Sequence, residues 1–211
     1  MHCCRFLIEN IIPEDIDFEK FNLPKKALKK GEIYYFEKKT LIIIKRGRVK
    51  ISLYEDEKEF ILYFLTNYNI CLCLDDNVLE AIEDSAFYII SPDNFHEIFN
   101  NPFFCNYILN AFSQNLILER DIIKNLAFKN FKQRTISFLI QTAENIGIKT
   151  DKGIEFTTKC NLEELANFLG TQRQTLSSFF TELKKKNLLH KEHNKFIILN
   201  LEKLKEYIHK V

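Results

Sequence analysis

The 211 residues are 46% hydrophobic and 28% charged, with only 5 Gly and 4 Pro, which is typical of a globular chain with a real core and no long flexible linker. No stretch is long and apolar enough to span a bilayer, and the N-terminus lacks the hydrophobic region of a signal peptide, so we expect a cytoplasmic protein without a membrane partner. Its 6 Cys are therefore expected to be free thiols, metal ligands or redox groups rather than structural disulfides.

Charge is unevenly distributed along the chain. Residues 129–211 carry 15 Lys and Arg against 9 Asp and Glu, a net charge of +6, whereas residues 1–128 carry 15 against 20, a net charge of −5. A basic C-terminal part that follows an acidic N-terminal part suits a DNA-binding module joined to a regulatory domain. The sequence contains no Walker loop, dinucleotide fingerprint, zinc-protease motif or nucleophile elbow, so we do not expect an enzyme.

The N-terminal half predicts mainly short strands. Residues 1–30 indicate a helical or irregular lead, and from Gly31 to about Ile90 closely spaced short strands alternate with turn signals. This pattern predicts an antiparallel sandwich or barrel. Within it, residues 40–44 and 49–54 predict a hairpin that turns near Gly47.

From residue 102 to residue 128 the hydrophobic period is helical. Apolar residues recur at alternating steps of three and four, with Glu119 as the one polar lapse, at five positions that we call the seam residues: Leu109, Phe112, Leu116, Ile123 and Leu126. Other faces are apolar too, for instance at Ile117, so the helix could pack both on its own domain and on a partner. We predict a dimerisation helix in a homodimer; a helix buried within one subunit is the alternative.

The stretch from residue 160 to residue 200 predicts a winged helix-turn-helix. Gly170 separates two amphipathic runs, and residues 171–174 fit a capping box with Thr171 as the N-cap of the second helix. Residues 188–191 and 195–199 then predict the two strands of a wing. An ordinary helical hairpin is the alternative.

The second helix of such a motif enters the major groove of double-stranded DNA and reads base edges near its N-terminus. The polar residues on that part of the helix are the predicted DNA contacts: Gln172, Arg173, Gln174, Ser177 and Ser178. Arg173 can pair bidentately with guanine, and a dimer would read a palindromic operator.

The order of these elements resembles the Crp/Fnr superfamily of dimeric transcription regulators. The resemblance covers nearly the whole chain and is most specific in LEELANFLGTQRQTLSSFFTELKKKNLL, IIIKRGRVKISL and KQRTISFLIQTAENIG. Within the superfamily the chain is most similar to the CooA-like haem-based gas sensors, through RFLIENIIP, EFILYFLTNYNICLCL, VLEAIE and RQT. The resemblance implies an α+β protein with a cyclic-nucleotide-binding-like β-barrel as sensor (residues 1–100), a long dimerisation helix (101–128) and a C-terminal winged helix-turn-helix (129–211), with RNA polymerase as a further partner.

Two departures from the superfamily bear on the effector. Its cyclic-nucleotide members grip ribose and phosphate with a Gly-Glu pair and an Arg followed by Ser or Thr, whereas residues 69–86 contain no Gly, no Arg and five acidic side chains. No cyclic nucleotide is therefore expected. Its iron–sulfur members carry an N-terminal cluster of spaced cysteines, of which this chain has only Cys3 and Cys4.

Cys71 and Cys73 form the most suggestive sensor site. On a strand they point to one face, at a spacing that lets only one thiolate reach a single iron. The resemblance implies that a Cys and a His of this segment exchange as axial haem ligands; Cys71 matches the Cys, but Cys73 replaces the His. It also implies an N-terminal ligand from the other subunit, for which His2 is the candidate. Loss of the segment's His leaves carbon monoxide, nitric oxide and redox sensing all open.

Three alternatives to a haem site stay open, two for these cysteines and one for the whole chain. They could be small buried hydrophobes, as free Cys often is. They could be the redox groups of a haem-free thiol regulator. The chain could also be a constitutive DNA binder that has lost its ligand.

Overall fold

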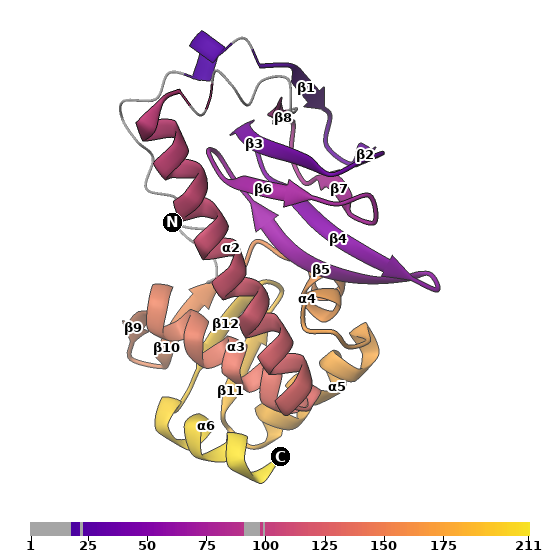
Figure 1. Cartoon of the computed structure of the whole chain (residues 1–211). Helices are drawn as coiled ribbons and strands as arrows, with labels where there is room; N and C mark the ends of the chain where they lie inside the picture. Colours follow the sequence, from indigo (N-terminus) through magenta and orange to yellow (C-terminus); the bar gives the residue numbers. More distant parts are fainter. Residues whose placement is uncertain (1–17, 22, 91–97, 99) are drawn as a thin grey trace. The chain divides into compact units, whose positions relative to one another are not determined.

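The computed structural model describes residues 18–21, 23–90, 98 and 100–211, and the candidate ligand His2 lies outside them. The chain forms two compact units that divide between Arg120 and Asp121, inside one long helix (Figure 1). Each unit is described by itself below. No helix in the described part of the chain is long and apolar enough to cross a membrane.

The N-terminal unit is built from two four-stranded antiparallel sheets, in the orders β1-β8-β3-β6 and β2-β7-β4-β5, which confirms the predicted sandwich or barrel. A short 3-10 helix, η1 (Phe18–Phe21), precedes the strands β1 (Lys25–Leu28), β2 (Ile33–Tyr35), β3 (Thr40–Arg46), β4 (Val49–Glu55), β5 (Lys58–Leu65), β6 (Ile70–Cys73), β7 (Val78–Ala81) and β8 (Ser85–Ile90).

The predicted hairpin at Gly47 is wrong in its pairing. Strand β3 pairs with β6 and β8, whereas β4 pairs with β5 and β7, so the chain crosses from one sheet to the other at Gly47. Gly47 has φ +92°, and a Cβ there would lie 2.3 Å from Ser85 Oγ and 2.7 Å from the carbonyl oxygen of Asp84. The crossing is this tight because only a residue without a side chain fits both the left-handed backbone and the contact with Ser85.

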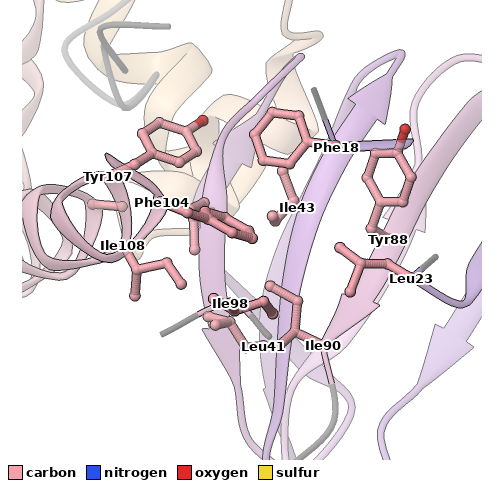
Figure 2. Close-up of a cluster of buried hydrophobic side chains, with 12 residues drawn as sticks. Phe18, Leu23, Leu41, Ile43, Tyr88, Ile90, Ile98, Phe104, Tyr107 and Ile108 are labelled. Atoms are coloured by element: carbon pink, nitrogen blue, oxygen red, sulfur yellow. The ribbon is translucent and has the colours of Figure 1, made fainter. Parts of the chain in front are cut away.

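Strand β3 is buried on both of its faces. On one face Leu41 and Ile43 pack against η1 and the start of α2 (Pro102–Phe128), in the cluster that Figure 2 shows. The aromatic rings of Phe18 and Phe104 meet edge to face there, 5.4 Å apart. Residues one position along β3, such as Ile42, alternate to the other face and are fully buried as well. At about 2 kcal/mol for each fully buried side chain, this packing fixes the first half of α2 on the barrel.

The C-terminal unit is a winged helix, as predicted. After α2 come α3 (Phe131–Ile146), β9 (Ile148–Thr150), β10 (Gly153–Thr157), α4 (Leu162–Phe168), α5 (Arg173–Lys185), β11 (Leu189–Glu192), β12 (Lys195–Ile198), α6 (Leu201–Tyr207) and the 3-10 turn η3 (Ile208–Lys210). The strands form one antiparallel sheet in the order β11-β12-β10-β9, so the wing hairpin is paired to the hairpin that precedes α4.

The start of α3 carries a capping box. The Gln133 backbone N–H donates to Asn130 Oδ1 at 3.0 Å, and the Asn130 N–H donates to Gln133 Oε1 at 3.2 Å. Two of the helix's orphan N–H groups are thereby satisfied by its own side chains, which fixes where α2 ends and α3 begins.

We expect Gly47→Ala to destabilise the N-terminal unit by at least about 3 kcal/mol, since left-handed strain and the clash with Ser85 add. Gly31→Ala is the matched control. Gly31 also has a positive φ, +83°, but nothing lies within 4 Å of its added Cβ, so only about 1–2 kcal/mol is expected. Urea unfolding followed by tyrosine fluorescence measures this, because seven of the 8 tyrosines precede residue 121. Equal losses of unfolding free energy in the two variants would contradict the close contact between Gly47 and Ser85.

Candidate functional sites

The helix-turn-helix consists of α4, a turn at Gly170 and α5. Asn161 caps α4: its Oδ1 accepts the backbone N–H groups of Glu163 and Glu164, both at 2.9 Å. Gly170 takes up φ +62° and ends α4 in the left-handed conformation that favours glycine. The predicted turn at Gly170 is confirmed.

The predicted N-cap of α5 is wrong by one residue. The Thr171 N–H donates to the Ala166 carbonyl at 3.0 Å and so belongs to the closure of α4, and α5 begins after Gln172. Gln172 makes no side-chain capping bond, so it supplies no acceptor for the N–H groups of the first turn. A phosphate oxygen placed beside these N–H groups would be stabilised by them and by the helix dipole.

Arg134 of α3 fixes the turn between the two helices. Its guanidinium donates from Nε to the Leu169 carbonyl at 2.9 Å, from Nη2 to Gly170 at 3.0 Å and from Nη1 to Lys129 at 2.7 Å. The planar fork of Arg suits several carbonyls at once. Sequence reasoning missed this residue, because an Arg on the polar side of a helix carries no signal of what it binds.

The five predicted DNA contacts, Gln172, Arg173, Gln174, Ser177 and Ser178, are all exposed. The apolar side of α5 is buried beneath them, with Leu176 and Leu183 both 0% exposed. Further along α5, Lys184 and Lys185 are exposed as well. These two cations were not among the predicted contacts, and only their place in the last turn distinguishes them from ordinary surface lysines.

Two sets of contacts hold the recognition helix and the wing. Glu182 of α5 accepts from Lys132 Nζ at 2.8 Å and from the Tyr207 hydroxyl at 2.6 Å, and these bonds, that of Lys132 first, lower the pKa of Glu182. The ammonium of Lys191 on β11 lies 5.8 Å from the ring centre of Phe180 on α5. The surface that carries the predicted DNA contacts is therefore tied to α3, α6 and the wing.

The seam residues lie mostly on the exposed side of α2. Leu109 is 56% exposed, Leu116 66%, Ile123 66% and Leu126 45%, whereas Phe112 is partly buried against the barrel core. The side of α2 that faces the barrel carries Tyr107, Ala111 and Asn115. An exposed row of large apolar side chains beside a buried one is unusual for a helix that has no partner.

Cys71 and Cys73 share the buried side of β6, at 1% and 0% exposure, with the half-exposed Leu72 between them. Burial, followed by a hydrogen bond with the Cys71 thiol, raises the pKa of Cys73 well above its ordinary value. The Cys73 thiol is therefore protonated at neutral pH. Tyr63 of β5, 3% exposed, is an electrostatic neighbour of both sulfur atoms.

A single Cys thiolate is a known type of axial haem ligand, so the sulfur of Cys71 or Cys73 would fit a haem once it had lost its proton. Both thiols are enclosed, so a group bound at either sulfur requires buried side chains of the barrel to shift. Within the described residues no three His, Cys, Asp or Glu side chains are placed to hold one metal ion together.

Two carboxylates of the acidic segment that follows β6 are paired with lysines of the same unit. Glu80 pairs with Lys50 at 2.9 Å, and Lys50 also pairs with Glu59 at 2.8 Å. Asp84 accepts from Lys29 Nζ and from the Lys30 backbone N–H, both at 3.0 Å. The buried Lys50 is thus shared between two carboxylates, which leaves it poorly placed to bind a phosphate.

Known proteins share the whole architecture. A Crp-like helix-turn-helix domain matches residues 133–207. A double mutant of CooA from Carboxydothermus hydrogenoformans is similar in structure, with a TM-score of 0.84, 27% identity and 98% of each chain covered. CprK complexed with OCPA has a TM-score of 0.77, with 18% identity over 90% of this chain and 92% of its own. The global nitrogen regulator of Synechococcus elongatus is 21% identical over 195 residues, which cover 86% of this chain and 88% of that protein. The predicted resemblance to Crp/Fnr regulators is confirmed.

We expect Arg173→Ala to cost about 1–3 kcal/mol of DNA affinity and to relax specificity at one base pair of each half-site, because a bidentate guanine contact is lost. Selection of binding sites from a random duplex library, done in parallel for wild type and variant, measures this. Lys184→Ala is the control: at the far end of α5 it should weaken all sequences alike. If Arg173→Ala also weakened every sequence equally, Arg173 would be a phosphate contact only.

Proposed function

We propose that this chain, a transcription regulator of the Crp/Fnr type, acts as a cytoplasmic homodimer whose affinity for double-stranded DNA is set by an effector in the N-terminal barrel. The observation that carries the proposal is the winged helix-turn-helix, whose second helix presents Arg173 and its polar neighbours to solvent. RNA polymerase is a further proposed partner. Neither enzymatic activity nor a cyclic nucleotide is part of the proposal.

The dimer is proposed from α2. A single winged helix buries too little surface for tight specific binding at physiological salt, so two recognition helices are needed on two half-sites. The exposed seam residues, 45% to 66% accessible apart from Phe112, supply an apolar row at the spacing of a two-stranded coiled coil. Pairing of two α2 helices would then set the distance between the recognition helices on a palindrome.

The effector is proposed to be haem, used for gas or redox sensing. The support is the 27% identity with CooA along the whole chain, together with two buried thiols on β6. Bound haem would supply an iron that takes small gases and changes redox state. Cys71 or Cys73 would hold it, and His2 of the other subunit is the candidate second ligand. Strand geometry allows only one of the two sulfur atoms to be the ligand.

A haem-free thiol switch is the second candidate. It is favoured by the burial of Cys71 and Cys73 on the same side of β6, which places two oxidisable sulfurs two residues apart on one strand. The absorption spectrum separates the two candidates, and a protein that shows neither haem nor thiol dependence would be a constitutive DNA binder.

We expect Leu116→Glu to produce monomers that lose operator binding, because a charge would be buried in the pairing surface. Asn110→Glu is the matched control, since Asn110 is an exposed position of the same helix outside the seam. Sedimentation equilibrium gives the mass of each variant. A Leu116→Glu protein that remains dimeric would place the interface elsewhere.

We expect the full chain, expressed with haem supplied, to show a Soret band. Either Cys71→Ser or Cys73→Ser should change the spectrum, but not both, whereas Cys105→Ser on α2 should leave it unchanged. Absence of Soret absorbance in the wild type would end the haem proposal. An unchanged spectrum in His2→Ala would remove the N-terminal ligand alone.

A further inference from the structure

Glu119 lies where the two rows of α2 meet. It follows Asn115 of the buried, barrel-facing row by four residues, and it stands three residues after Leu116 and four before Ile123 of the seam. Residues three and four apart are neighbours on a helix surface, so Glu119 adjoins both rows. It is also the polar lapse in the seam pattern, an exposed carboxylate among large apolar side chains.

The structure gives this carboxylate a specific partner. The Tyr63 hydroxyl donates to Glu119 Oε1 at 2.5 Å. Tyr63 lies on the buried side of β5, where its neighbours Ile61 and Leu65 are both 0% exposed, so its hydroxyl needs a partner that it can reach from the barrel interior. The bond spans 56 positions of sequence and joins the barrel to the helix.

Two further bonds join α2 to the same part of the barrel. Asn115 Nδ2 donates to the Ile70 carbonyl at 3.2 Å, and the Tyr107 hydroxyl donates to the Tyr68 carbonyl. Both of these acceptors are backbone atoms, whereas the bond to Glu119 depends on one movable side chain. The Tyr63–Glu119 bond is therefore the one of these three bonds that depends on a barrel side chain, so a rotation of Tyr63 alone is enough to break it.

Tyr63 also adjoins the candidate effector site. Both thiols of β6 are electrostatic neighbours of its hydroxyl, and Tyr63, Cys71 and Cys73 are all at most 3% exposed. Because the barrel interior is closely packed, a bulky group bound at the thiols requires buried side chains to move, and we take Tyr63 to be one of them.

We propose that Glu119 is a positioning residue for subunit pairing and that Tyr63 holds it on the barrel. While Tyr63 donates to it, the carboxylate is bound at the edge of the seam. Once Tyr63 is displaced, an unpaired carboxylate from each subunit lies at the apolar pairing surface, which weakens the dimer and with it the binding to two half-sites. This inference rests on the proposed dimer and on the proposed effector site.

The test uses the full chain and four proteins besides the wild type: Tyr63→Phe, Glu119→Gln, the double variant, and Tyr35→Phe as the control for an exposed tyrosine. Sedimentation equilibrium should give at least a tenfold higher dimer dissociation constant for Tyr63→Phe. Glu119→Gln in that background should restore the constant to within about twofold, because an uncharged amide no longer resists burial. Tyr35→Phe should match the wild type.

An unchanged constant in Tyr63→Phe would overturn the proposal, and so would a loss that Glu119→Gln fails to rescue, since Tyr63 would then act by packing alone. A wild type that is monomeric at every concentration would refute the dimer itself. In that case amide hydrogen exchange decides: Tyr63→Phe should still speed exchange in residues 113–120 and leave 189–198 unchanged, and no change in 113–120 would refute the role of Tyr63 as the group that holds Glu119.

Discussion

The structure depends on helix α2, which carries large apolar side chains on two of its faces. The first half of α2 is fixed on the barrel by Phe104, Tyr107 and Ala111, each at most 4% exposed. This burial leaves the seam residues on the accessible side, where the hydrophobic effect would favour the proposed second copy of the same helix. In the proposed dimer, a barrel that moved α2 by a small amount would change the surface that pairs. Glu119 stands at the border between the two faces, and the proposed role of Tyr63 in holding it would account for one charged residue in an otherwise apolar pattern.

The DNA-binding unit is rigid for a different reason, the number of polar ties to the helix-turn-helix. Arg134 donates to three carbonyls around the turn, and Glu182 accepts from both Lys132 and Tyr207. A charged group in each set makes these hydrogen bonds stronger than neutral ones. The recognition helix thus keeps its place within its own unit, so regulation by the barrel would have to act on the spacing of whole units rather than on the shape of the reading helix.

The winged helix could be predicted from the sequence because its signals are local: Gly170 at the turn, polar residues on one side of the second helix and two strands around residues 193–194. Elements that depend on distant partners could not be predicted in the same way. The strands beside Gly47 pair in different sheets, and the Thr171 N–H closes α4. Strand β7 lies in an acidic segment that gives no clear strand pattern, because two of its carboxylates pair with Lys29 and Lys50. The seam pattern showed Glu119 as a lapse, but its partner Tyr63 lies 56 residues away, and no spacing rule connects them.

Control of DNA binding by the state of the barrel is the proposal on which regulation depends. Fluorescence anisotropy tests it with one selected palindromic duplex, measured on the same full-length preparation before and after haem is added in reducing buffer. Since a population shift of about 1.4 kcal/mol changes a binding constant tenfold, we predict at least a tenfold difference in duplex affinity between the two states. Equal affinity in the two states, with haem demonstrably bound, would show that the barrel does not control DNA binding.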